Sequence, residues 1–219
     1  TGRSQPYQWL FLSIFFSLLG TTTSWGQVVR WVNNTGATRP ATVDVFDSNT
    51  NTTTTMNVTA TTYTTIQSAI NAASTNDVVY ITNGEYRNTS QPTSTNCSYV
   101  GTSQELSYYL SVAYKQILIT SETGNHCTSS ARLVGFGFNI YGAGNTTIQG
   151  LEMDSIRVNA FWNSNCCSYP PSSNVKIRNN KISNTRGHGV KTDSGGPTGE
   201  AINRQNWVIS GNTFENIGF

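Results

Sequence analysis

Charged side chains are scarce in this chain of 219 residues, at 11% of the total, and the formal net charge is only +2. Binding of nucleic acid or of an anionic membrane surface through bulk charge needs a larger basic excess, so the composition argues against both partners. Histidine is rarer still, with two residues, and no Cys-x-x-Cys spacing occurs. These shortages favour disulfides over a zinc site as the role of the four cysteines.

Long apolar runs are also few, and the one near the N-terminus, Trp9–Leu19, is too short to cross a bilayer comfortably. Arg3 before this run and the small residues Ser24 and Gly26 after it are typical of a secretory signal peptide. The sequence therefore predicts a signal peptide over residues 1–26, a secreted or cell-surface protein, and no other membrane contact. A membrane anchor is the alternative interpretation of the same run.

The four cysteines form an even set, which suggests full pairing in an exported protein. Four cysteines allow three connectivities. We expect a bridge between Cys97 and Cys127 and a vicinal bridge between Cys166 and Cys167.

Asn, Thr, Ser and Gly dominate the composition, and the Thr52–Thr55 run is the densest example. Such a composition predicts a poorly ordered or loosely strapped segment over residues 27–60. The remainder, residues 61–219, is long enough to bury one core. Its last repeat stops at Phe219, so we expect this domain to be truncated at its C-terminus.

A helical pattern runs directly into a strand pattern near residue 75. Apolar residues at positions i, i+3, i+4 and i+7 from Ile66 to Ala73 predict a short amphipathic helix. Thr64 and Gln67 have capping-box spacing, which marks the start of the helix. The helical spacing places Gln67 on the polar face. A strand follows over Val78–Ile81. A helix of about three turns must rest its apolar face on something, and we expect it to cap the end of a larger structure.

Three segments align without gaps: residues 145–156, 174–185 and 206–217. Each begins with Asn, and Ile148, Ile177 and Ile209 match. A repeat of short strands and tight turns predicts a solenoid, with Asn at turns that need a left-handed backbone. An antiparallel sandwich is the alternative, which the absence of Asn-Gly hairpins among the repeats disfavours.

The stretch Ile66-Gln-Ser-Ala-Ile70, followed by Asp77-Val-Val-Tyr-Ile-Thr-Asn-Gly-Glu-Tyr86, resembles the N-terminal start of right-handed parallel β-helix proteins of the pectate-lyase-like superfamily. The resemblance implies an all-β fold: a right-handed parallel β-helix with a short N-terminal capping α-helix. The superfamily includes pectate, alginate and chondroitin lyases, polygalacturonases, phage tailspikes and adhesins. The fold therefore does not fix the chemistry.

The chain inserts long loops after the same strand in two successive coils, near residues 163–173 and 193–205. Ile140, Phe161 and Val190 are predicted to point inward. Alternation then sends the next residue of each strand outward, so that Tyr141, Trp162 and Lys191 form a column. Aromatic rings stack on sugars and cations bind uronates, so this column predicts a polysaccharide groove. Its substrate-binding residues would be Tyr141 and Trp162 in the column, with Asn163 and Arg157 at the edge. Alternatively, the two aromatic rings stack only for stability.

If the chain acts like the lyases of this superfamily, its chemistry is β-elimination, which needs a base, a group that neutralises the carboxylate and a proton donor. Lyases of the superfamily use Lys or Arg as base, often with Ca²⁺. Here Lys191 would be the base, Arg186 would lower its pKa, and His188 lies beside them. Asp193 and Glu200 would hold Ca²⁺. The paired Asp motifs of polygalacturonases and a diagnostic lyase motif are absent.

Two functions of different classes follow from this sequence. One is a secreted β-helix that acts on polysaccharide, by β-elimination on acidic, uronate-containing glycans. The other is a non-catalytic cell-surface or adhesion β-helix that binds glycans. A phage-spike-like protein is a third interpretation, but the predicted signal peptide argues against it.

Overall fold

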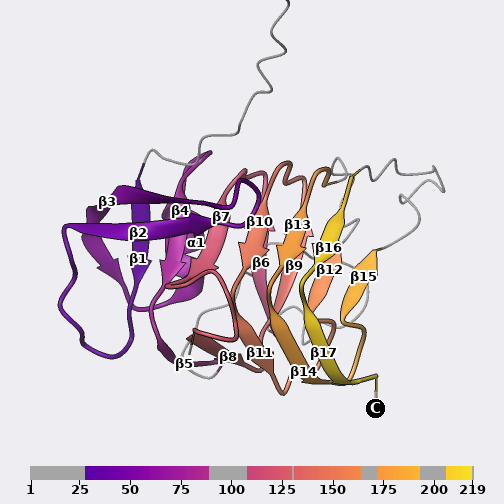
Figure 1. Cartoon of the computed structure of the whole chain (residues 1–219). Helices are drawn as coiled ribbons and strands as arrows, with labels where there is room; N and C mark the ends of the chain where they lie inside the picture. Colours follow the sequence, from indigo (N-terminus) through magenta and orange to yellow (C-terminus); the bar gives the residue numbers. More distant parts are fainter. Residues whose placement is uncertain (1–27, 89–107, 130, 164–171, 193–205, 219) are drawn as a thin grey trace, which may run out of the picture.

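The computed structural model describes residues 28–88, 108–129, 131–163, 172–192 and 206–218. These residues form β-strands in three sheets and one short α-helix (Figure 1). The predicted signal peptide lies outside the described residues. Within them, no helix combines the length and apolarity needed to cross a membrane.

The three sheets differ in size. The eight-stranded sheet has the order β16-β13-β10-β7-β4-β1-β3-β2. Its strands are β1 (Val29–Val32), β2 (Thr42–Asp47), β3 (Thr52–Tyr63), β4 (Val78–Ile81), β7 (Leu118–Ser121), β10 (Thr147–Gln149), β13 (Lys176–Arg178) and β16 (Val208–Ser210). The five-stranded sheet contains β5 (Gly84–Arg87), β8 (Ala131–Val134), β11 (Glu152–Asp154), β14 (Lys181–Thr185) and β17 (Thr213–Ile217). The four-stranded sheet contains β6 (Tyr109–Ala113), β9 (Gly137–Tyr141), β12 (Phe161–Asn163) and β15 (Val190–Thr192).

From β4 onward the chain visits the eight-, five- and four-stranded sheets in turn, and we call each such circuit a coil. Each strand pairs in parallel with its counterpart in the next coil, as in β4–β7–β10–β13–β16. Ile148 lies opposite Ile177, which lies opposite Ile209, so the gapless repeat is in register. The prediction of an all-β chain with parallel sheets is confirmed, and the winding is compatible with the predicted solenoid.

The main core fills the space between the three sheets. Inward rows stack from coil to coil, as Ile119, Ile148 and Ile177 do, and all three are fully buried. Phe138 and Phe161 stack in the next row, with ring centroids 5.7 Å apart. Burying such side chains stabilises the fold by about 1.5–3 kcal/mol each, so the stack depends on every coil presenting an apolar residue at these positions.

Left-handed turns recur in each of the last three coils, five residues apart. In the first of these coils the residues are Asn145, Gly150 and Ser155, with φ of 53°, 71° and 53°. The next two coils repeat the pattern at residues 174, 179 and 184 and at residues 206, 211 and 216. Asn tolerates this backbone better than other residues that carry a side chain. Amide groups also bond along the stack, from Asn206 Nδ2 to Asn174 Oδ1 and from Asn216 Nδ2 to Asn184 Oδ1, so the predicted role of Asn at turns is confirmed.

The predicted helix is present as α1 (Ile66–Ala72), and its apolar face is buried in the main core. The N-cap is Thr65, one residue later than expected, because its hydroxyl accepts the Ser68 N–H. Gln67 is buried rather than on the polar face: its amide pairs with both backbone groups of Ser111 in β6. Because β6 is an edge strand, this side chain replaces part of a missing neighbouring strand. Lys115 closes the other end by donating to three helix carbonyls, those of Ile70, Asn71 and Ala73.

The segment predicted to be poorly ordered contains three strands. β2 and β3 form an antiparallel hairpin. The last part of β3 pairs in parallel with β1, and the rest of the hairpin extends across β4 and β7 (Figure 1). Polar residues of β3 alternate with buried Met56 and Val58. These two side chains pack in a second core with Trp31, Tyr80 and Leu118 on the outer face of the eight-stranded sheet. The Thr-rich composition misled the prediction, because a hairpin with one buried face needs few apolar residues.

Candidate functional site

The outward column of the four-stranded sheet is partly as predicted. Trp162 lies opposite Lys191, as expected. On its other side, however, Trp162 lies opposite Asn139, because Phe161 pairs with Phe138 and not with Ile140. Tyr141 is therefore two residues away from the column, and the prediction that placed it there is wrong. The two registers present the same alternation of inward and outward residues, so the sequence pattern could not distinguish them.

Tyr109, rather than Tyr141, supplies the second aromatic ring. Its ring centroid lies 5.3 Å from that of Trp162, although β9 separates their strands. Gly137, opposite Tyr109 in β9, makes this reach possible: a Cβ there would lie 2.9 Å from the Tyr109 ring. The Tyr109 hydroxyl accepts hydrogen bonds from the backbone and side-chain amides of Asn159, which fix the ring. A glycine at an outward strand position was the available sequence signal.

Lys191 completes this cluster. Its Nζ lies 5.5 Å from the centroid of the Trp162 ring, within cation–π range. We call Tyr109, Trp162 and Lys191 the aromatic face. Tyr141 lies apart from it, is only 4% exposed, and meets exposed Tyr114 edge-on at 6.0 Å.

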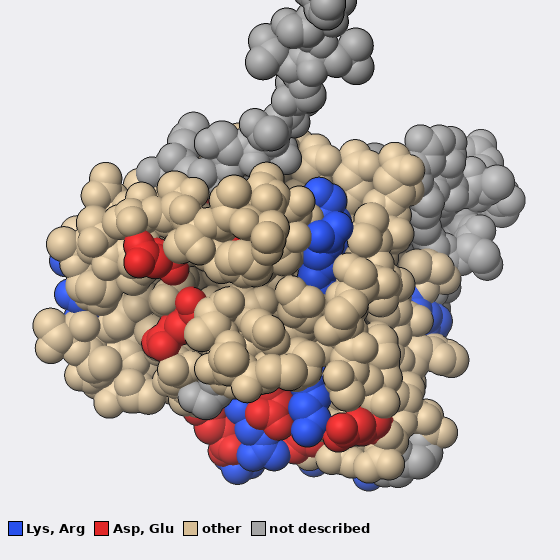
Figure 2. All heavy atoms as spheres, viewed as in Figure 1, with Lys and Arg blue, Asp and Glu red and all other residues tan. Residues whose placement is uncertain are grey.

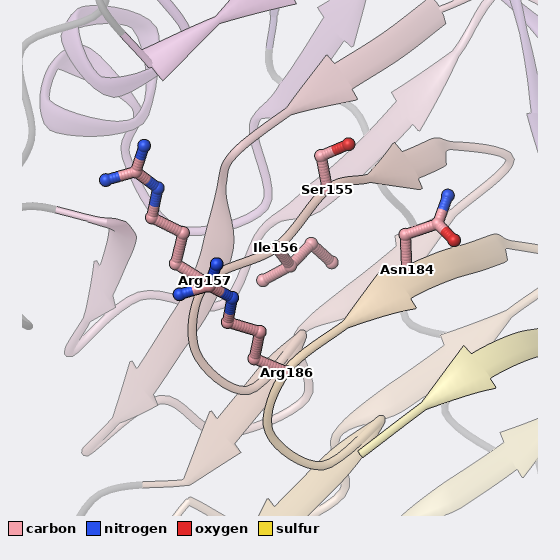
Figure 3. Close-up of a pocket in the computed structure, with 5 residues that line it drawn as sticks. All are labelled: Ser155, Ile156, Arg157, Asn184 and Arg186. Atoms are coloured by element: carbon pink, nitrogen blue, oxygen red, sulfur yellow. The ribbon is translucent and has the colours of Figure 1, made fainter. Parts of the chain in front are cut away.

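A pocket of about 240 Å³ opens where the five-stranded sheet leads to the four-stranded sheet. We call it the arginine pocket; it is lined by Ser155, Ile156, Arg157, Asn184 and Arg186. Figure 3 shows the two arginine side chains running in the same direction, while Ser155 and Asn184 point elsewhere. The Arg186 N–H donates to Ile156 O at 2.9 Å, so the two arginines leave neighbouring coils at a stacked position.

Contacts join the arginine pocket to the aromatic face. Arg157 Nη1 donates to the Tyr108 hydroxyl at 3.0 Å, and its guanidinium lies 5.4 Å from the Tyr108 ring centroid. Tyr108 precedes Tyr109, whose ring meets Trp162. The residue that Arg157 contacts is thus the chain neighbour of the residue that packs against Trp162, although Tyr109 itself is buried.

Asp154, the residue before Ser155 of the pocket, is ionised and already paired with Arg132. Burial alone would raise the pKa of Asp154, but hydrogen bonds outweigh this effect and lower the pKa to about 2. The donors are Asn184, Ser183, Arg132 and Ser155. Since none of the described lining residues is acidic, the charge of the pocket itself is positive.

Acids and bases alternate on the outer face of the five-stranded sheet. Figure 2 shows them side by side over β8, β11 and β14. Arg132 bridges Glu85 and Asp154 at 2.9 and 2.6 Å, and Lys181 lies 3.4 Å from Glu215. Asp154 is buried on this face, and its carboxylate lies among these donors. This face is a network of ion pairs.

The remaining predicted site residues are scattered. His188 is exposed, and its backbone N–H donates to Asn159 Oδ1, which lies beside Tyr109. Asn163 is buried, so it does not form the exposed edge expected of it. Asp193 and Glu200 lie outside the described residues, and the Ca²⁺ site stays a prediction. The described residues contain no cluster of three or more metal-binding side chains.

Cys127 has a free, exposed thiol, so the bridge expected between it and Cys97 is not formed in this structure. Cys97, Cys166 and Cys167 lie outside the described residues, and the vicinal bridge stays a prediction. The Cys127 Sγ lies 3.4 Å from Nε2 of the adjacent His126.

Comparisons with protein-family models, with curated proteins and with solved structures gave no match to this chain.

Proposed function

We propose that this protein is a right-handed parallel β-helix that binds acidic polysaccharide on the outer side of its four-stranded sheet, outside the cell or at its surface. The regular circuit of the chain through three sheets supports the fold. The resemblance of residues 66–86 to the start of pectate-lyase-like proteins supports the hand, and the apolar run before residue 20 supports export.

One observation carries the function: an aromatic face and a cationic pocket lie close together, since Arg157 of the pocket contacts Tyr108, the residue before Tyr109 of the face. Half-buried Trp162, braced by Tyr109, offers a flat apolar surface of the kind on which sugar C–H groups stack. Arg157 and Arg186 offer guanidinium groups, which bind carboxylates with paired hydrogen bonds. A glycan bearing carboxylates satisfies both features, whereas a neutral glycan leaves the pocket charges unused.

The position of Lys191 favours a second candidate, β-elimination on a uronate. A sugar stacked on Trp162 would lie beside the Lys191 ammonium, which is 5.5 Å from the ring centroid. In its neutral form the amine would take the proton from C5 of the uronate. The C4–C5 double bond then forms as the C4–O bond breaks, and the departing oxygen takes up a proton. The carboxylate would rest on an arginine.

Titration with oligosaccharides from pectate, alginate and chondroitin tests the proposal. Trp162→Ala is expected to weaken binding by about 1–3 kcal/mol with little change in folding stability. Lys181→Ala, on the five-stranded sheet, is the matched control and should leave binding unchanged. Equal behaviour of the two variants, or no binding by the parent protein to any of the three, would refute the proposal.

Absorbance of the unsaturated product separates the two candidates. In a lyase, Lys191→Ala should abolish turnover while binding stays within about tenfold, because the base acts in the transition state. In a binding protein, the parent shows no product, and the same substitution weakens binding modestly and in a salt-dependent way.

A further inference from the structure

Asn139 occupies the centre of the column that contains Trp162. It lies opposite Ser111 of β6 on one side and Trp162 of β12 on the other. Its neighbours in β9, Phe138 and Ile140, point into the core, so its own side chain lies on the outer side of the sheet. The residue is nevertheless only 1% exposed.

The amide of Asn139 is unpaired. Neither Nδ2 nor Oδ1 has a hydrogen-bond partner, although the group offers two donors and an acceptor with two lone pairs. Burial of a polar group without a partner opposes folding, so each such group calls for an explanation.

Other buried amides of this protein are fully used. Gln67 pairs with both backbone groups of Ser111. Asn180 accepts from Leu151 N and donates to Ile148 O and to Asn212 Oδ1. Gln149 accepts from Ser48 and donates to the Phe46 carbonyl and the Thr120 hydroxyl. The stacked coils thus satisfy these three buried amides. Other buried polar atoms also lack partners, such as Asn49 Oδ1 and Thr185 Oγ1, but among the described residues Asn139 alone has both amide atoms buried and unpaired.

We propose that Asn139 is the residue that recognises sugar hydroxyl groups, donating to one hydroxyl and accepting from its neighbour when a sugar stacks on Trp162. This inference rests on the proposed function. Aromatic rings select a sugar for its apolar face and arginines select its charge, but neither determines how the hydroxyls are arranged. An amide with a free donor and a free acceptor beside the ring supplies that selection. Because Asn139 is almost fully buried, the groups that cover it must move when the sugar binds.

Asn139→Leu tests the inference, because leucine has nearly the same size and no polar atoms. If the amide is kept for a ligand, the variant should melt at the same or a higher temperature than the parent, since an unsatisfied group has been removed. It should bind the pectate, alginate or chondroitin oligosaccharide that the parent prefers about tenfold more weakly. Its discrimination among the three oligosaccharides should also shrink.

Unchanged affinity in a stable Asn139→Leu variant would overturn the inference, because the amide would then take no part in binding. A lowered melting temperature in both Asn139→Leu and Asn139→Ala would also overturn it, because the amide would then serve the fold. Trp162→Ala keeps the two proposals apart. If it weakens binding while Asn139→Leu does not, the binding face stands and the role of Asn139 falls.

Discussion

On the outer face of the five-stranded sheet, Arg132 lies between two carboxylates, whereas at the adjoining corner Arg157 and Arg186 stand in successive coils with no acid among the described lining residues. Both surfaces are built on the same stack of strands. On the first, opposite charges face each other across coils and stabilise the stack. On the second, two exposed like charges stand at a stacked position in successive coils, where an anionic ligand could pair with both. The difference separates a surface that holds the fold together from one suited to binding.

The largest expected loss of stability is on the ion-paired outer face of the five-stranded sheet. Asp154→Ala removes the acceptor of four hydrogen bonds and leaves Arg132 without its buried partner, so we expect a loss of about 2–3 kcal/mol in unfolding free energy. Denaturant unfolding measures this loss. Glu152→Ala, a half-buried acid in the same strand, is the control and should cost under about 0.5 kcal/mol. Equal losses would mean that Asp154 does not organise this face.

The pH dependence of stability sharpens the same point. The pKa of Asp154 in the folded protein, about 2, lies below its ordinary value of 3.8. Its carboxylate therefore stabilises the fold above about pH 4, and this stabilisation is lost as the pH falls toward 2. We expect about 2 kcal/mol to disappear over that window. The stability difference between the parent and Asp154→Asn should shrink over the same range, and a constant difference would contradict the assignment.

Substitutions in the arginine pocket should change ligand binding and not folding stability. Replacing Arg157 and Arg186 together by Ala is expected to weaken binding of acidic oligosaccharides by about 1–2 kcal/mol, and by less at high salt. Unfolding free energy should stay within about 0.5 kcal/mol of the parent, because both side chains are exposed. The double Arg→Lys variant keeps the charge but loses the paired donors, and should fall between the two. If the double Ala variant lost stability but not binding, the two arginines would serve the fold and not a ligand.

The smallest effect is expected at Lys181. Its contact with Glu215, at 3.4 Å between half-exposed and exposed side chains, resembles the surface ion pairs that contribute little. Lys181→Ala should change the unfolding free energy by less than about 0.5 kcal/mol and should not alter oligosaccharide binding. A larger binding change would show that the five-stranded face also contacts the ligand.

The repeat predicted the stacking of coils well, because matched Ile residues and turn Asn residues leave a strong periodic signal. The register between β9 and β12 could not be predicted, since Phe138 and Ile140 are equally suited to point inward. Tyr109 was missed for a related reason. Its ring in β6 reaches Trp162 in β12 across the intervening strand β9, and it can do so only because Gly137 of β9 has no side chain.

Composition gave a wrong prediction for residues 27–60, where packing against a neighbouring sheet determines the structure. The hairpin of β2 and β3 is rich in Thr and Asn, yet Val45, Met56 and Val58 give it one apolar face, and a sheet was available to receive that face. The predicted helix boundary was nearly correct, but Gln67 was wrongly predicted to be exposed. Its side chain is buried because it bonds the backbone of the edge strand β6, and the sequence around residue 67 does not indicate this contact. Sequence patterns specify periodicity, whereas these side chains respond to neighbours distant in the chain.

The left-handed turns divide each coil into parts of fixed and of variable length. Within a coil the three turns are always five residues apart, at 145, 150 and 155, then 174, 179 and 184, then 206, 211 and 216. The rest of the circuit runs from 155 to 174 in one coil and from 184 to 206 in the next, that is 19 and then 22 residues. Among these last three coils, the variation in length thus falls on the part that carries the four-stranded sheet and the loops after it. Such a chain can gain or lose residues there, in evolution or in the laboratory, one coil at a time, while the strands of the other two sheets keep their alignment.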